Sequence, residues 1–216
     1  SNAEGTDAQG VKTFDSDGIT LGTDTDYNQN TATFISYGFH LSGATGVSNS
    51  DGDITTTVDA NEFGLWSNGK FTGNATAAQA LGHGLGTKVA FVFVKNRDDA
   101  EAAHGWFPGM DGEYLNLTNT NARSAGTSIF PGVDDTTTFE VGDHNSANGT
   151  GDDMLFMAFG QTLGVVQGGE YRGNGNADGP MVLLNFRPRF LLVKSHSAGH
   201  EWVVWDTERL AYNEHS

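Results

Sequence analysis

The fold is decided by the run VAFVFV at residues 89–94, in which small or β-branched residues alternate with phenylalanine up to Lys95. Such runs are typical of β-strands. The stretches MLFMAF at 154–159 and RFLLV at 189–193 have the same character. Sustained helical periodicity is absent from the sequence, so these runs predict a chain made almost entirely of strands.

Shorter apolar stretches extend this pattern along the chain. ITL at 19–21 and TFISYGF at 33–39 are predicted strands, and WVVW at 202–205 follows 189–193 closely enough to predict a hairpin. Thirty glycines against four prolines indicate frequent turns without proline-rich linkers. We therefore predict an all-β, β-sandwich-like fold, built from two sequence-similar copies packed together.

Charge and composition exclude several classes of function. The chain has 27 acidic and 11 basic side chains and a formal net charge of −16. Nucleic acids and anionic membranes require clustered Lys and Arg, so neither is an expected partner. The apolar runs are too short to span a bilayer, so membrane insertion is not expected either. Because the chain has no cysteine, a disulfide framework and a thiolate site are also excluded.

An internal repeat is the most informative feature of the sequence. Matched residues keep their order while the offset between them shrinks, as it would if loops were shorter in the second copy. The matches are Ile19 with Phe139, Asn28 with Asn148 and Phe39 with Phe159 at 120 positions, 71–74 with 171–174 at 100, Val94 with Val193 at 99, and Trp106 with Trp202 at 96.

The repeat predicts the domain organisation. We expect residues 1–11 to be a tag-cleavage scar and an N-terminal segment. The first copy is expected at 12–111, with an acidic insertion at 42–63, and the second copy at 139–216. Residues 112–138 would connect the two copies. Asn74 and Asn174 each follow a glycine in an aromatic-x-Gly-Asn corner. We expect each to hold a turn through positive φ or through a side-chain bond to the backbone. Trp106 and Trp202 are expected at equivalent core positions.

Six stretches carry a resemblance to a known family: 14–22, 114–118, 139–148, 171–175, 186–194 and 202–206. Over residues 12–213 the chain resembles the repeated domain of tail-associated proteins of tailed bacteriophages, common among phages of marine bacteria. The resemblance implies a virion structural or host-adhesion protein located on the tail, outside the cell. It supplies no catalytic or ligand residues. Since the family continues beyond the position of Ser216, we expect a fragment of a longer protein.

Calcium is the cofactor that the acidic loops indicate, because it prefers several oxygen ligands on a flexible loop. Asp24, Asp26 and Asn28 alternate in one loop, and Asp51 and Asp53 alternate in the acidic insertion. Neither loop has the full EF-hand pattern. The alternative is that these carboxylates belong to ordinary solvated turns.

Carbohydrate binding is the second hypothesis, because sugar rings stack on aromatic faces while Asn side chains bind their hydroxyls. The candidate residues are Trp66, Asn68, Tyr27 and Tyr114, with Trp66 preferred because it lies beside the acidic insertion. The alternative is that these aromatic residues fill the core of the sandwich.

Catalysis is not expected. The carboxylate pairs 134–135 and 152–153 are adjacent in sequence, so on a strand their side chains would point to opposite faces. No Gly-x-Ser-x-Gly elbow occurs, and His196 with His200 is expected at a hairpin tip rather than as a zinc or nickel site on a helix.

These observations predict a non-enzymatic phage tail or virion structural protein that acts as an exposed module binding host-surface glycans. The alternatives are a purely structural tail spacer or assembly module and a bacterial secreted lectin-like domain. The expected partners are host glycans or other virion proteins, and a homo-oligomer is left open.

Overall fold

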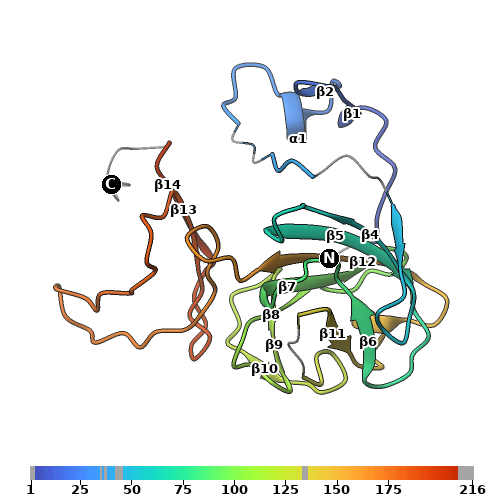
Figure 1. Cartoon of the computed structure of the whole chain (residues 1–216). Coiled ribbons are helices and arrows are strands. Elements are labelled where there is room, and N and C mark those ends of the chain that lie inside the picture. The colour runs from blue at the N-terminus through green and yellow to red at the C-terminus, as the bar shows by residue number, and fades with distance from the viewer. Residues whose placement is uncertain (1–2, 35, 37, 42–45, 133–135, 209–216) are drawn as a thin grey trace. The chain divides into compact units, whose positions relative to one another are not determined.

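The computed structural model describes residues 3–34, 36, 38–41, 46–132 and 136–208. In this part of the chain all elements are β-strands except two single-turn helices, which confirms the all-β prediction. The chain divides into two compact units, one of Glu4–His40 and one that begins at Leu41 (Figure 1). No helix among the described residues is long and apolar enough to cross a membrane.

The larger unit is built on an antiparallel sheet of eight strands. Their spatial order is β10-β9-β8-β7-β12-β5-β4-β3. The strands are β3 (Val47–Asn49), β4 (Thr56–Ala60), β5 (Trp66–Thr72), β7 (Val89–Asn96), β8 (His104–Trp106), β9 (Glu113–Asn116), β10 (Ser124–Ala125) and β12 (Asp153–Gly160). The sheet thus combines strands that lie far apart in the sequence.

Strand β12 occupies the middle of this sheet and pairs antiparallel with β5 on one side and β7 on the other. Its residues alternate between half-buried and fully buried along the whole strand, as expected for a strand with two unlike faces. The run predicted at 154–159 is therefore confirmed as a strand, and so is the run at 89–94, which lies in β7.

A second, two-stranded sheet of β6 (Gln79–Gly82) and β11 (Thr138–Val141) covers one face of the large sheet and completes the sandwich. The core lies between the two sheets. Phe156 of β12 meets Phe139 of β11 edge to face, with ring centroids 5.1 Å apart. Leu81 of β6 and Val92 and Val94 of β7 are fully buried in the same cluster.

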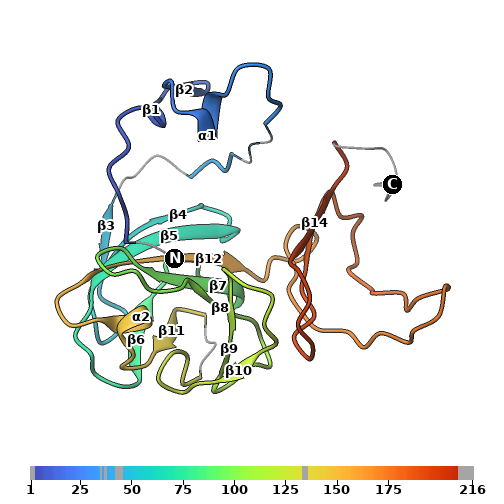
Figure 2. The ribbon, with the colours of Figure 1, turned by 180° about the vertical axis from the view of Figure 1, so that it is seen from behind.

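The single-turn helix α2 (Asn145–Asn148) lies beside β6 and β11 (Figure 2). Its last residue, Asn148, is fully buried and joins three parts of the fold. The Asn148 Nδ2 atom lies 3.1 Å from the carbonyl oxygen of Gly142 and 3.0 Å from that of Thr76, and Oδ1 accepts a 2.8 Å bond from the Asn74 amide. Asn148 thus ties α2 to the corner that follows β5.

The Glu4–His40 unit contains a two-stranded sheet of β1 (Val11–Phe14) and β2 (Ile19–Leu21), followed by α1 (Thr25–Asn28). The strand predicted at 19–21 is confirmed. The strand predicted at 33–39 is not formed by the described residues of that range, and Ile35 and Tyr37 lie outside the described residues. A strand needs a hydrogen-bonded neighbour, and among the described residues of this unit the paired strands are β1 and β2.

The predicted C-terminal hairpin is confirmed as β13 (Phe190–Val193) paired with β14 (Val203–Asp206). The match of Trp106 with Trp202, however, is wrong. Trp106 lies opposite Val92 of β7, whereas the residue opposite Leu191 of β13 is Trp205. Trp205 follows Trp106 by 99 positions, the same offset that separates Leu191 from Val92.

The predicted corners at Asn74 and Asn174 do share one local bond. The Asn74 side chain accepts a bond from the Thr76 amide at 2.9 Å, and the Asn174 side chain accepts one from the Asn176 amide at 3.0 Å. The expectation of a side-chain bond to the backbone is confirmed at both corners.

Candidate functional site

The face of the eight-stranded sheet that points away from β6 and β11 carries the candidate site. Along β7 and β12 the core residues alternate with residues of the opposite face, because successive side chains of a strand point to opposite sides. We call this surface the outer face. It comprises Asp59, Trp66, Asn68, Phe91, Phe93, Leu155, Met157 and Phe159.

Strand register places four of these side chains in a line across the sheet. Asp59 of β4 lies opposite Asn68 of β5, Asn68 opposite Met157 of β12, and Met157 opposite Phe93 of β7. All four are half-buried. The line therefore changes from polar at β4 to apolar at β7.

An aromatic row runs beside this line and crosses the sheet. The row consists of Trp66, Phe159, Phe91, Phe107 and Trp202, and its successive ring centroids are 5.9, 6.0, 4.6 and 6.3 Å apart. Trp202 reaches the row from the segment before β14, and its Nε1 donates to the Asn116 carbonyl at 3.4 Å. These spacings are typical of packed aromatic pairs. The row gives the outer face a rigid apolar floor.

Asn68 is the polar group most suited to contact a ligand here. Its Oδ1 atom is buried and has no hydrogen-bond partner in the structure. A buried acceptor without a donor costs roughly 1–3 kcal/mol, so a ligand hydroxyl or amide that donated to it would recover that energy. Asp59, its neighbour on β4, accepts a bond from the Gly46 amide at 2.6 Å.

The four residues predicted to bind a glycan have different surroundings. Trp66 is only 7% exposed and packs on Phe159, so most of its ring is covered. Tyr114 of β9 packs with its ring against His104, with ring centroids 4.7 Å apart. Tyr27 belongs to α1 of the Glu4–His40 unit. Glycan binding by these residues stays a prediction, and Asn68 is the one that lies on the outer face with an unpaired acceptor atom.

The predicted site omitted most of the outer face, namely Phe91, Phe93, Met157 and Phe159. The signal that could have found these residues is their alternation with core residues in the two strongest strand runs, 89–94 and 154–159. Because β12 lies between β5 and β7, these alternate residues lie on the same face of the sheet as Asn68.

Residues of the first loop proposed to bind calcium make hydrogen bonds within their own turn. Asp24 is the N-cap of α1 and accepts a 2.7 Å bond from the Asp26 amide, while Asn28 donates from Nδ2 to the Gly22 carbonyl at 2.9 Å. Such bonds explain the alternating acidic pattern without a metal ion.

The carboxylates of the second acidic loop also accept hydrogen bonds from the chain. Asp51 accepts a bond from the Asn49 side chain at 3.1 Å, and Asp53 accepts one from the Ala80 amide at 3.0 Å, which ties the insertion to β6. Within the described residues no group of three or more His, Cys, Asp or Glu side chains could hold a metal ion. The calcium hypothesis gains no site in this part of the chain.

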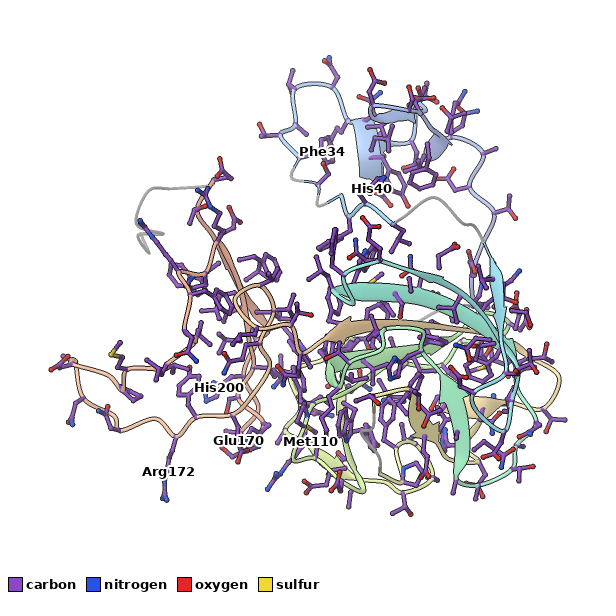
Figure 3. All side chains as sticks on the ribbon, viewed as in Figure 1. Phe34, His40, Met110, Glu170, Arg172 and His200 are labelled. Carbon is purple, nitrogen blue, oxygen red and sulfur yellow. The ribbon has the colours of Figure 1, made fainter. Side chains whose placement is uncertain are left out.

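Among the described residues, His104 of β8 combines a buried side chain with a large pKa shift. Burial, and to a smaller extent the nearby His144, lower its pKa from 6.5 to about 4. His196, in the turn after β13, places its Nε2 atom 3.3 Å from the carboxylate of Glu170. Figure 3 shows Glu170 and Arg172 on the long irregular segment before β13, and His200 in the β13–β14 turn.

Comparison with known proteins identifies the family of the chain. The model of a family described as a domain of unknown function, DUF7483, matches residues 1–216, so the chain belongs to that family. No curated protein matches the chain. No solved structure matches it either.

Proposed function

We propose that this member of the DUF7483 family is a non-enzymatic module on the tail of a bacteriophage virion that binds a surface carbohydrate at the outer face. The observation that carries the proposal is the buried Oδ1 atom of Asn68, which has no hydrogen-bond partner and lies in line with Met157 and Phe93. An apolar ring face beside a single polar acceptor suits a pyranose, which presents C–H groups on one face and hydroxyls at its edge.

Two further observations support the proposal. The aromatic row fixes the floor of the outer face, so a ligand would meet a preorganised surface and lose little binding energy to rearrangement. The resemblance of residues 12–213 to repeated domains of phage tail proteins supports a place on the virion, where contact with host-surface sugars is the expected task. The net charge of −16 favours neutral or cationic ligands over acidic polymers.

A glycan array probed with the full chain tests the proposal, followed by titration of the strongest sugar against variants. We expect Asn68→Ala and Phe93→Ala each to weaken binding by about tenfold, which corresponds to one lost hydrogen bond or ring contact of about 1.4 kcal/mol. Phe14→Ala is the matched control, because Phe14 is an exposed phenylalanine of β1 in the other unit. Failure to bind any sugar, or equal affinity in all three variants, would overturn the proposal.

A structural assembly module is the second candidate function. The observation that favours it is the number of large apolar side chains exposed outside the sandwich, in the Glu4–His40 unit and in the region from residue 163 onward. Monomeric soluble proteins rarely expose so many apolar groups on neighbouring elements. Such surfaces are typical of contacts with other protein chains.

A further inference from the structure

A small pocket lies at the open end of the β13–β14 hairpin, where β13 begins and β14 ends. Its volume is about 140 Å³, and the described residues that line it are Arg187, Arg189 and Thr207. One water molecule needs roughly 10–15 Å³ of such space, so the pocket has room for a small polar group. None of these three residues belongs to the outer face, so the pocket does not overlap the proposed carbohydrate site.

The local backbone directs both arginines into this pocket. Pro188 stands between them, and a proline favours an extended conformation for the residue that precedes it. In an extended segment the side chains of residues i and i+2 point to the same side. The Thr207 amide donates to the Arg189 carbonyl at 3.1 Å, which continues the pairing of the hairpin by one residue and places the threonine beside the arginine.

A carboxylate of the chain itself lies beside two of the three lining residues. The Glu208 Oε1 atom accepts a 3.3 Å bond from the Thr207 hydroxyl and lies 3.8 Å from the Arg189 Nη1 atom. The side chains of Arg189 and Glu208 are 83% and 85% exposed, so water and salt weaken their attraction. The contact shows which chemical group these side chains accept, and a competing group can displace it readily.

Arg187 is the lining residue that remains available. Its guanidinium group is exposed and makes no hydrogen bond or ion pair with a described residue. A guanidinium presents its donors in a planar fork that matches the two oxygens of a carboxylate. A carboxylate that entered the pocket from outside would therefore gain a partner that Glu208 does not have.

We propose that this pocket binds the carboxylate group of a small organic acid, which displaces Glu208 from Thr207 and Arg189 and also pairs with Arg187. Glu208 is then an internal occupant that the ligand replaces. The site takes a group that the outer face does not, and the proposal does not rest on carbohydrate binding there.

The charge of the chain explains why the ligand is a carboxylate rather than a phosphate. Two of the 11 basic residues stand within three positions here, in a chain of net charge −16. The surrounding field opposes each added negative charge, so a monoanion enters at a smaller cost than a phosphate group of about −2. The position of the Glu208 carboxylate supports the same choice.

Nuclear magnetic resonance of the ¹⁵N-labelled full chain tests the proposal through the side-chain Nε–Hε signals of its arginines. The probes are sodium glucuronate and sodium N-acetylglycinate, which are a sugar acid and a simple acid. We expect saturable shifts of the Arg187 and Arg189 signals with at least one of them, and none with glucose, the neutral counterpart of glucuronate. Equal binding of both acids supports recognition of the carboxylate alone, whereas a preference for one also assigns the type of acid.

Two substitutions should change the affinity in opposite directions. We expect Arg187→Gln to weaken binding roughly tenfold, because it removes a charge-assisted hydrogen bond. The matched control is Arg172→Gln, which removes the same charge from an exposed arginine of the segment before β13 (Figure 3). We expect Glu208→Gln to tighten binding roughly two- to fivefold, because a weak internal competitor is lost. Its control is Glu62→Gln in the β4–β5 turn, which changes the net charge equally.

Three results would overturn the proposal. The first is shifts no larger than those in about 100 mM sodium chloride, since these would report ionic screening alone. The second is tighter binding of inorganic phosphate than of either organic acid. The third is a Glu208→Gln variant that binds no more tightly than Glu62→Gln, because Glu208 would then not occupy the place of the ligand. The titration of the unmodified chain decides the first two without any variant.

Discussion

Glycine at position 69 gives a sharp test of how β12 packs against β5. A Cβ atom at Gly69 would overlap the ring of Phe156, which lies directly opposite on β12 and packs edge to face on Phe139. Overpacking of this kind typically costs about 1–3 kcal/mol, and the better strand propensity of alanine returns less than about 1 kcal/mol. We therefore expect Gly69→Ala to lower the free energy of unfolding by about 2 kcal/mol.

Shrinking the opposing ring should relieve this cost. Phe156→Leu alone is expected to cost about 1–2 kcal/mol through the cavity that it leaves. In the double variant the alanine methyl group fills part of that cavity, so the combined loss should be smaller than the sum of the two single losses by at least about 1 kcal/mol. Urea unfolding followed by circular dichroism measures all four proteins of the cycle.

The control is Gly173→Ala, because no heavy atom lies within 4 Å of a Cβ placed there. Its stability should match that of the unmodified chain within about 0.5 kcal/mol. Additive losses in the cycle, or an unchanged stability in Gly69→Ala, would show that Phe156 does not lie over Gly69 and that the register of β12 is different.

Two further predictions concern buried polar groups of the sandwich. The pKa of His104 is about 4 in the folded chain and near 6.5 in the unfolded chain. Between pH 4 and pH 6.5 this imidazole therefore binds a proton mainly in the unfolded chain. Stability should therefore fall by roughly 3 kcal/mol as the pH drops from 7 to 4, and His104→Leu should reduce this dependence in urea titrations at several pH values. Asn148→Ala should lower stability by about 2–3 kcal/mol because it leaves the Asn74 amide and the Gly142 carbonyl without their partner, whereas Asn28→Ala should leave the sandwich unchanged. A melting temperature that Asn148→Ala does not change would contradict the role of this side chain.

Much of the local structure could be predicted from the sequence. Apolar runs identified β7, β12 and the β13–β14 hairpin, and in β7 and β12 burial on one face imposes a period of two. The turn bonds at Asn74 and Asn174 followed from the known tendency of Asn to bond its own backbone. Each of these features depends on neighbouring residues in the sequence.

The sheet order could not be predicted in the same way. β12 enters between β5 and β7, more than 55 residues from either in the sequence, and no turn signal encodes such a pairing. The match of Trp106 with Trp202 failed for a related reason. Identical residue types were aligned, whereas strand register depends on which residues pair, and a constant offset of 99 positions selects Trp205.

The candidate site was only partly predictable. Asp24 and Asp53 carry the alternating pattern of a calcium loop, but their oxygens accept backbone amides, and sequence alone does not distinguish a cap from a ligand. Trp66 was expected on the surface because it lies near polar residues, yet its neighbours across the sheet cover it. Which aromatic side chains share the outer face depends on the strand order, and that order came only from the structure.

Carbohydrate binding at the outer face is tested most directly by nuclear magnetic resonance of the ¹⁵N-labelled full chain, titrated with the strongest sugar from the array. We expect the largest amide shift changes at Asn68, Phe93 and Met157, together with the side-chain amide of Asn68, and saturation at a single affinity. Shift changes confined to the loops around Asp24 and Asp51, or no changes with any sugar, would contradict binding at this face.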